Sequence, residues 1–368
     1  MVSDQEIGGR VREALTKCDA LATQAALAEA VEMTPDALSR ALNGARAFSS
    51  IEITRIAEVL GEDVHWLITG EPDPLAIRFV ARHDYDTASR RYGLPDGHDA
   101  NPELDGIALA YQQAAPWIPS REFELPGTAL GMRSALEDGF VLDFADRIES
   151  RLEVDVVRLQ GPVTDYSFTV SGRPVILLKS TPNWFRSNWS LGHELAHLAL
   201  GHSVADATSE RDERTANAFA AELLMPRSEM RAHNWSTVGE EELAILLWHY
   251  GVSLEALANR LHALRIDAPI VESVNAQGST QRLLRRHQAA LTSDMSADPI
   301  SARMQKASER RIPVPLIAAH LRGIADGRLG KGTLAWLLET TPDELEVEEP
   351  PRPEPLSADA LLHALAAD

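Results

Sequence analysis

Cysteine is almost absent from this chain, because Cys18 is the only one among 368 residues. One thiol cannot form an internal disulfide, and the sequence has no group of cysteines to hold a metal ion. This composition is typical of a protein from a reducing compartment. Any metal site must therefore use histidine and carboxylate side chains.

Long hydrophobic runs are missing as well. No stretch approaches the roughly 18 consecutive apolar residues needed to span a bilayer. The opening MVSDQEIGGR also lacks the basic region and apolar core of a secretory signal. We therefore expect a cytoplasmic protein with no membrane partner. A hydrophobic fraction of 44% in 368 residues is still enough for two or three folded units.

Positive charge is scarce, since the formal net charge is −20. This balance argues against broad electrostatic attraction to DNA or anionic membranes, although a local patch can still bind either. The one basic stretch, residues 274–311, has seven Lys or Arg against three acids. We interpret it as a solvated helix face, with contact to nucleic acid or an acidic protein as the alternative.

Apolar residues recur at helical spacing between residues 8 and 70, which predicts a small all-α unit of four short helices. The best defined of these is TPDALSRALNG. Thr34 is a candidate N-cap and Pro35 suits the first helical position. Asn43 and Gly44 favour the left-handed backbone conformation that ends a helix at its C-terminus.

The remaining chain alternates between helical and strand patterns. Residues 71–138 contain many loop signals and are expected to form a linker or an uncertain helical region. After residue 139, one helix precedes the runs EVDVVRL and RPVILLKS, which are typical of strands. Helices are then predicted at 187–200, at 210–224 and within 238–265.

The C-terminal part has weaker signals. Residues 266–345 are expected to form a helical region, although the sequence patterns that indicate ordered structure become weaker after about residue 273. Residues 346–368 are expected to form a linker rich in Pro and Glu, followed by a short tail helix. The fold class predicted from these patterns is α+β and mostly helical.

The stretch SLGHELAHLALGH, residues 190–202, carries the clearest chemical motif. His193 and His197 are four apart, so on a helix both imidazoles lie on one face and can bind a single ion. In zinc peptidases with this spacing, the glutamate beside the first histidine, here Glu194, acts as general base. Such a site needs three protein ligands and one open position.

The third ligand is expected from the helix at 210–224, which offers several acids. At about 100° per residue, Glu222 faces about 180° away from Glu213, whereas Glu210 is only about 60° from it. Helical spacing therefore leaves both Glu213 and Glu210 as candidates for the third ligand, and Asp212 is a poorer candidate.

These histidines have two other interpretations. His193 and His197 can lie on an ordinary polar helix face without a metal. His202 can be proposed as a ligand, but Gly201 breaks the helix before it. We therefore assign His202 a structural or supporting role.

The segments RSNWSLGHELAHLALGH and ERTANAFAAELLMP occur in the order and spacing of one known family. Residues 139–265 thereby resemble the ImmA/IrrE metallopeptidases. This resemblance implies a gluzincin-like α+β domain, in which a small antiparallel sheet covers the motif helix and VILLKS is an edge strand. It also implies that the peptide substrate adds to the sheet edge as a strand. The implied metal is Zn²⁺, with Glu194 as base and the ligands His193, His197 and Glu213.

QAALAEAVEMTPDALSRALNG, followed by IAEVLG and WLITG, resembles a lambda-repressor-type (XRE) helix-turn-helix domain over residues 1–70. The resemblance implies DNA contacts by Gln24, Thr34, Asp36, Ala37, Ser39, Arg40 and Arg46. The charge departs from this pattern, because residues 1–70 contain six Lys or Arg against eleven Asp or Glu. The alternative role is dimerisation or binding of another protein.

Together these patterns predict a zinc endopeptidase of narrow specificity that cleaves a transcriptional repressor or other regulatory protein in a stress or mobile-element response. The alternative is a DNA-binding transcriptional regulator whose zinc site is structural or sensory. A weaker alternative is one component of a toxin and antitoxin pair. The expected partners are a protein substrate, DNA through the helix-turn-helix, and a second copy of the chain in a homodimer.

Overall fold

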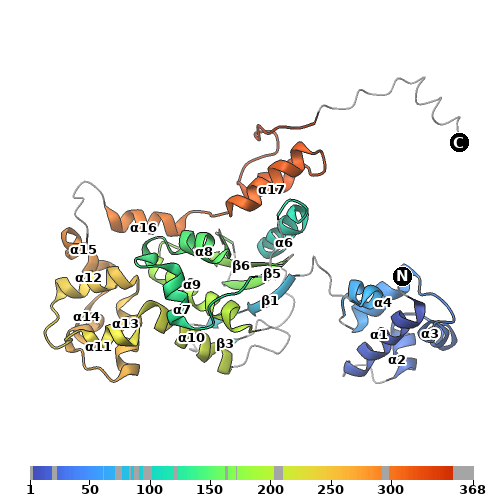
Figure 1. The fold of residues 1–368 in the computed structure, drawn as a ribbon, viewed down its shortest axis with the longest axis horizontal. Coiled ribbons are helices and arrows are strands. Elements are labelled where there is room, and N and C mark those ends of the chain that lie inside the picture. Colours follow the sequence, from blue (N-terminus) through green and yellow to red (C-terminus); the bar gives the residue numbers. More distant parts are fainter. Residues whose placement is uncertain are drawn as a thin grey trace. The chain divides into compact units, whose positions relative to one another are not determined.

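The computed structural model describes residues 3–18, 23–60, 62–70, 77–82, 84–86, 91–93, 102–118, 123–161, 165–170, 172–202, 210–291 and 298–350. The chain divides into two compact units, Met1–Ala76 and Ile77–Asp368 (Figure 1).

The first unit is all-α, as predicted, with five described helices where four were expected. They are α1 (Asp4–Lys17), α2 (Gln24–Ala30), α3 (Pro35–Leu42), α4 (Ser50–Leu60) and α5 (Val64–Thr69). The predicted ends of α3 are confirmed. The Thr34 hydroxyl accepts a hydrogen bond from the Ala37 N–H at 3.2 Å, and Gly44 follows the helix with a left-handed φ of 70°.

The second unit is built around a four-stranded mixed sheet. The strands are β1 (Ile77–Arg82), β5 (Tyr166–Val170), β6 (Arg173–Lys179) and β4 (Asp155–Leu159), in that spatial order. β1 and β6 both pair with β5 in antiparallel fashion, whereas β4 runs parallel to β6. A separate hairpin joins β2 (Asp84–Asp86) and β3 (Arg91–Gly93).

This sheet corrects three expectations. The sheet is not wholly antiparallel, and VILLKS belongs to β6, which lies between β5 and β4 rather than at an edge. Residues 71–138, expected as a linker or helical region, contribute the edge strand β1. β5 was not predicted at all. Its five residues form a strand because β1 and β6 supply hydrogen-bond partners on both sides.

Both faces of the sheet are covered by helices, so the strands alternate between two cores. In β6, Ile176 and Leu178 pack into the larger core, whereas Val175 and Leu177 pack into the second core on the opposite face. Helices α6 (Pro102–Ala114), α17 (Val314–Ala325) and α18 (Lys331–Leu337) cover the second core.

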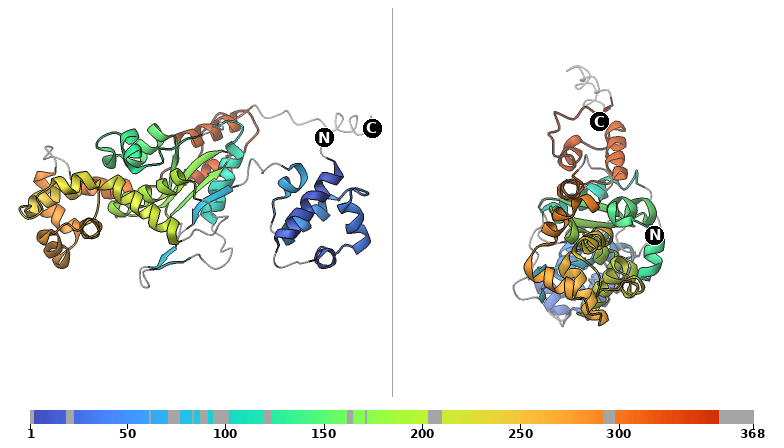
Figure 2. Two further views of the ribbon diagram at one scale, coloured as in Figure 1. Left: turned by 60° about the horizontal axis from the view of Figure 1, so that its bottom comes forward. Right: turned by 90° about the vertical axis from the view of Figure 1, so that its left-hand side faces the viewer.

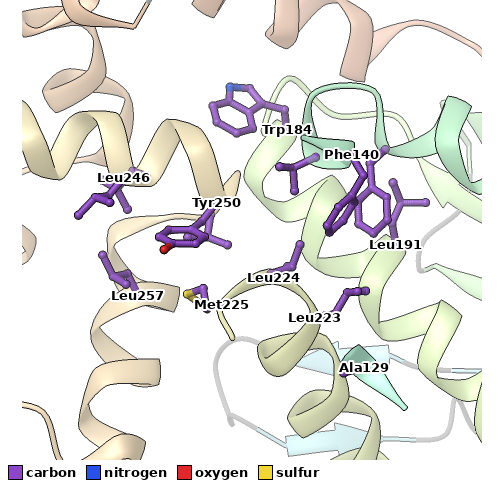
Figure 3. Packing of buried hydrophobic residues seen from close by; sticks show 14 of the residues in the cluster. Ala129, Phe140, Trp184, Leu191, Leu223, Leu224, Met225, Leu246, Tyr250 and Leu257 are labelled. Carbon is purple, nitrogen blue, oxygen red and sulfur yellow. The ribbon is translucent and has the colours of Figure 1, made fainter. Parts of the chain in front are cut away.

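The other described helices of this unit contribute to the larger core, and Figure 2 shows their ribbon from two further directions. They are α7 (Ala129–Leu136), α8 (Phe144–Leu152), α9 (Trp184–Leu200), α10 (Glu210–Leu224), α11 (Arg227–Ala232), α12 (Glu240–Tyr250), α13 (Leu254–Leu264), α14 (Pro269–Gln277), α15 (Thr280–Arg286) and α16 (Pro299–Ser308), with short 3-10 turns η1 (Phe140–Leu142) and η3 (Gln288–Ala290). Figure 3 shows Leu191 of α9, Leu224 of α10 and Tyr250 of α12 buried in this core.

The C-terminal part also differs from expectation. Among the described residues after 273, helices continue, and α15 and α16 bury Leu283, Leu284 and Ile300 in the larger core. Residues 346–350 have no helix or strand, and the predicted tail helix lies in residues 351–368, outside the described residues. Among the described helices, none has the length and apolar character to cross a membrane.

The basic stretch is a solvated helix face only in part, because Arg303, Arg310 and Arg311 are half-buried whereas its other four basic side chains are exposed. Several of its charged groups pair with acids from elsewhere in the unit: Arg286 with Glu240, Arg310 with Glu339, Lys306 with Asp143 and Asp146, and Arg311 with Asp146 and Glu149. These acids are distant in sequence, which is why the local pattern did not reveal them.

Candidate metal centre

The helix α9 carries the histidine motif, and its ends follow from its sequence. The Asn183 side chain caps the first turn by accepting a hydrogen bond from the Arg186 N–H at 3.2 Å. Gly201 ends the helix with a left-handed φ of 65°, which a residue without a Cβ adopts at no steric cost. The intervening regular helix keeps His193 and His197 one turn apart.

The helix α10 packs directly against α9, and small residues allow the close approach. Gly192 of α9 lies against Ala220 of α10, whose Cβ would be only 3.5 Å from a Cβ added at the glycine. Ala216 and Ala220 are fully buried at this contact. Because Glu213 lies on the same side of α10, the contact brings its carboxylate to the two histidines.

Three donor groups meet between the helices. His193 Nε2 lies 3.1 Å from His197 Nε2. The two oxygens of Glu213 lie 3.4 Å from His193 Nε2 and 3.5 Å from His197 Nε2. All three side chains are buried, and their candidate ligand atoms lie within 4.8 Å of one another.

The donor set fits a zinc ion. Two nitrogens at about 2.0–2.1 Å from a tetrahedral ion are themselves about 3.3 Å apart, close to the separations of 3.1, 3.4 and 3.5 Å found here. Two imidazoles and one carboxylate are also a donor set of catalytic zinc sites, which retain one open position.

The structure shows which of the candidate acids on α10 lies beside the two motif histidines. Glu210 is exposed at the start of α10 and is not part of the donor group. Asp212 lies 3.7 Å from His202 Nε2, and Glu222 faces away and pairs with Arg260. Glu213 is therefore the acid of this helix that reaches both motif histidines.

Glu194 lies beside the donor group and is only 2% exposed. Burial raises the pKa of its carboxyl to about 7, because the charged form loses its hydration. His193 and the Ser167 hydroxyl oppose this change, whereas Asp165 and Glu213 add to it. The result is a carboxyl group with a pKa suited to proton transfer near neutral pH.

His202 contacts the back of the second motif histidine. Its Nδ1 lies 3.0 Å from Nδ1 of His197, while Nε2 of His197 faces the other donors. The geometry agrees with the supporting role expected for His202, because the second ring nitrogen of a metal-binding histidine usually has a partner that fixes its orientation.

Two polar residues near the centre were missed in the sequence. Ser167 belongs to β5 and lies beside Glu194, and Asp165 precedes the same strand and accepts a hydrogen bond from the Ser190 hydroxyl at 2.6 Å. A cavity of about 120 Å³ is lined by Asp165, Ser190 and Arg186, among others. No local signal marked Ser167 or Asp165, since β5 was not predicted.

The proposed DNA contacts occupy the surface of the first unit. Gln24, Thr34, Asp36, Ser39 and Arg40 are exposed, and Ala37 and Arg46 are half-buried. All six basic side chains have partners within the unit: Arg10 with the carbonyls of Leu67 and Ile68, Arg12 with Asn43, Lys17 with Glu13, Arg40 with Asp36, Arg46 with Glu52 and Arg55 with Glu32.

Comparison with known protein families gives two matches. Residues 149–262 match the IrrE N-terminal-like domain, and residues 23–67 match a helix-turn-helix family. No curated protein and no solved structure matches the chain in these comparisons. Both resemblances inferred from the sequence are confirmed. The chain combines an N-terminal XRE-type helix-turn-helix domain with a peptidase-family domain of the ImmA/IrrE type.

Proposed function

We propose that the second unit is a zinc-dependent endopeptidase with narrow specificity. The observation that carries this proposal is the convergence of His193, His197 and Glu213 on one buried point, with Glu194 beside it. These three side chains would hold the zinc, which supplies a Lewis acid that polarises a peptide carbonyl and makes water more acidic.

Glu194 is the proposed general base. Its burial makes the carboxylate more basic than an exposed glutamate, so it can accept a proton from the attacking water. The same carboxyl can then donate that proton to the amine that leaves as the peptide bond breaks. A purely structural metal site would need no such base.

The substrate chain is proposed to bind beside β1. This strand is an edge of the described sheet, lies next to β5 and contacts α9. β5 carries Ser167, which lies beside Glu194. A peptide added to β1 as a further strand would therefore run close to the proposed base. The repressor substrate, the stress or mobile-element response and the homodimer stay predictions from the sequence.

Metal content tests the proposal directly. We expect about one zinc per native chain after dialysis, loss of zinc in Glu213→Gln, and retention in the matched control Glu210→Gln, measured by elemental analysis. Glu194→Gln should keep the zinc because this residue is not a ligand. A native protein without zinc, or zinc that is indifferent to Glu213, would contradict the proposed ligand set.

The second candidate is a DNA-binding regulator with a structural or sensory zinc site. It is favoured by the helix-turn-helix match and by the exposure of Thr34, Ser39 and Arg40 on α3 and at its start. It is disfavoured by the intramolecular pairing of basic side chains, which leaves fewer cations for phosphate contacts.

A further inference from the structure

A cavity of about 50 Å³ lies between β4, α8, α9 and α16. The motif histidines, Glu194 and Glu213 are not among its lining residues. It is lined by the start of α8, by Trp184, Ser187 and Asn188 of α9, and by a group of basic side chains. These basic side chains are Arg158, Arg303, Lys306 and Arg311.

Arg158 of β4 is the most unusual member, because it is only 6% exposed. Its Nη1 donates to the Lys306 carbonyl at 2.9 Å, but its Nε has no hydrogen-bond partner. In the described part of the chain it forms no ion pair. Burial, and secondly the neighbouring Arg311, lower the pKa of this guanidinium. Asp146, Glu309 and Asp165 oppose this change through their charges, although a buried arginine is normally bonded directly to an acid.

Arg303 of α16 is the second cation without a bonded acid. Its guanidinium lies over two aromatic rings, 3.5 Å from the centre of Trp248 and 4.7 Å from that of Trp184. Nη1 donates to the Trp248 carbonyl at 3.3 Å, and Nη2 is buried without a partner. The two rings hold the cation in place, and burial lowers the pKa of this guanidinium to about 10, a change that the charge of Asp143 opposes.

The other two cations are already neutralised. Lys306 pairs with Asp143 and Asp146, and Arg311 pairs with Asp146 and Glu149. Of the acids in these pairs, Asp143 lines the cavity. The four cations therefore face three acids, which leaves one positive charge in excess, and the buried donors without a partner belong to Arg158 and Arg303.

The start of α8 adds a further anion-binding element. Phe144 and Ala145, the first residues of this nine-residue helix, line the cavity. The first N–H groups of a helix lack partners within the helix and favour a negative charge. Asp143 stands at the N-cap position but makes no capping hydrogen bond, because its carboxylate is held by Lys306.

We infer that this cavity is a binding site for an oxyanion of the size of phosphate, held by Arg158, Arg303 and the first turn of α8. A volume of about 50 Å³ accommodates only a few water-sized groups, which suits one phosphoryl group and excludes a whole nucleotide or a peptide. The ligand is either free phosphate or the phosphoryl end of a larger molecule that extends out of the opening. This site goes beyond the proposed peptidase function.

Calorimetric titration with inorganic phosphate tests the inference. The protein is first stripped of metal with a chelator, so that phosphate cannot bind through zinc, and chloride at equal ionic strength provides the reference. We expect saturable phosphate binding that is weakened about tenfold or more by Arg158→Gln or Arg303→Gln, since each removes a charge-assisted contact. Arg231→Gln, which changes an exposed arginine of α11, should bind as the native protein does.

Each result of these titrations supports or overturns the proposed oxyanion site. Phosphate binding no stronger than that of chloride, or binding kept in both Arg158→Gln and Arg303→Gln, overturns the site. If Arg158→Gln does not fold, as judged by circular dichroism, the Arg303→Gln titration decides alone. A parallel titration with phosphoserine identifies the source: binding of both probes supports a phosphoryl group on a larger molecule, and binding of inorganic phosphate alone supports the free ion.

Discussion

His197 uses its two ring nitrogens in different directions. Nε2 faces His193 and Glu213, and Nδ1 lies 3.0 Å from Nδ1 of His202. With a metal on Nε2, the proton of neutral His197 would be on Nδ1, which would then donate to Nδ1 of His202 and hold the ring in place. His202 is therefore a positioning residue for the proposed metal site.

Replacing this partner should weaken metal binding. We expect His202→Ala to raise the zinc Kd by about 10- to 100-fold, because loss of such a partner loosens the ring that holds the metal. A competition titration against a chelator of known affinity measures the change. His262→Ala, at an exposed histidine of α13, is the matched control. Equal zinc affinity in both variants would remove His202 from the site.

Asp155 is a buried acid that links one helix to two strands of the sheet. It accepts hydrogen bonds from Arg173 at 2.7 and 3.0 Å and from the Tyr111 hydroxyl at 2.8 Å. Burial, with Asp155 as the next cause, raises the pKa of Tyr111 well above its usual value, so the phenol remains a donor. The group links α6 to β4 and β6.

Removing this charge should be costly. Asp155→Asn is expected to lower the free energy of unfolding by about 3 kcal/mol, since it leaves the half-buried guanidinium of Arg173 without its counter-ion. Glu137→Gln changes a surface carboxylate that also bonds two arginines, and should cost less than about 1 kcal/mol. Urea denaturation of both variants gives the comparison, and equal losses would contradict the assignment.

At the scale of elements, the proposed metal site depends on how closely α10 approaches α9. The small side chains of Ala216 and Ala220 and the absence of one at Gly192 set this approach. The two histidines come from one helix and Glu213 from the other, so helix separation and ligand geometry are coupled.

A larger residue at this contact should disturb both stability and metal binding. Ala220→Leu is expected to cost about 1–3 kcal/mol by overpacking and to weaken zinc binding as Glu213 is pushed away. Ala218→Leu, on the exposed side of α10, should leave both unchanged. Unfolding and chelator competition measure the two effects, and native zinc affinity in Ala220→Leu would show that the contact does not set the site.

At the scale of the whole molecule, the charge balance favours the proposed peptidase activity over DNA binding. The net charge is −20, and the helix-turn-helix unit has no surplus of basic groups. Its cations are also engaged with partners inside the unit, as in the pairs Arg46 with Glu52 and Arg55 with Glu32. Non-specific DNA affinity, which depends on neutralising phosphates, should therefore be low.

Fluorescence anisotropy with a random-sequence DNA duplex checks this expectation for the full chain. We predict a Kd weaker than about 10 µM at low salt, with little dependence on salt concentration, because few counter-ions would be released. Arg40→Gln should then change nothing measurable. Sub-micromolar binding that falls steeply with salt and is lost in Arg40→Gln would favour the DNA-binding regulator.

The sequence by itself determined the elements whose signals are local. The bounds of α10, the stop at Gly201 and the cap at Thr34 follow from helical periodicity and end residues. The four-residue spacing of His193 and His197 likewise places both on one face of any helix that contains them.

Only the tertiary structure decided what depends on contacts between distant segments. Helical angles could not separate Glu213 from Glu210, but the packing of α10 on α9 brings Glu213 to the histidines and leaves Glu210 exposed. Pairing with neighbouring strands likewise gives β5 its strand conformation and places β6 in the interior of the sheet. The acids that pair with Lys306 lie more than 150 residues away in sequence, so no local pattern could show which cations are bonded to an acid.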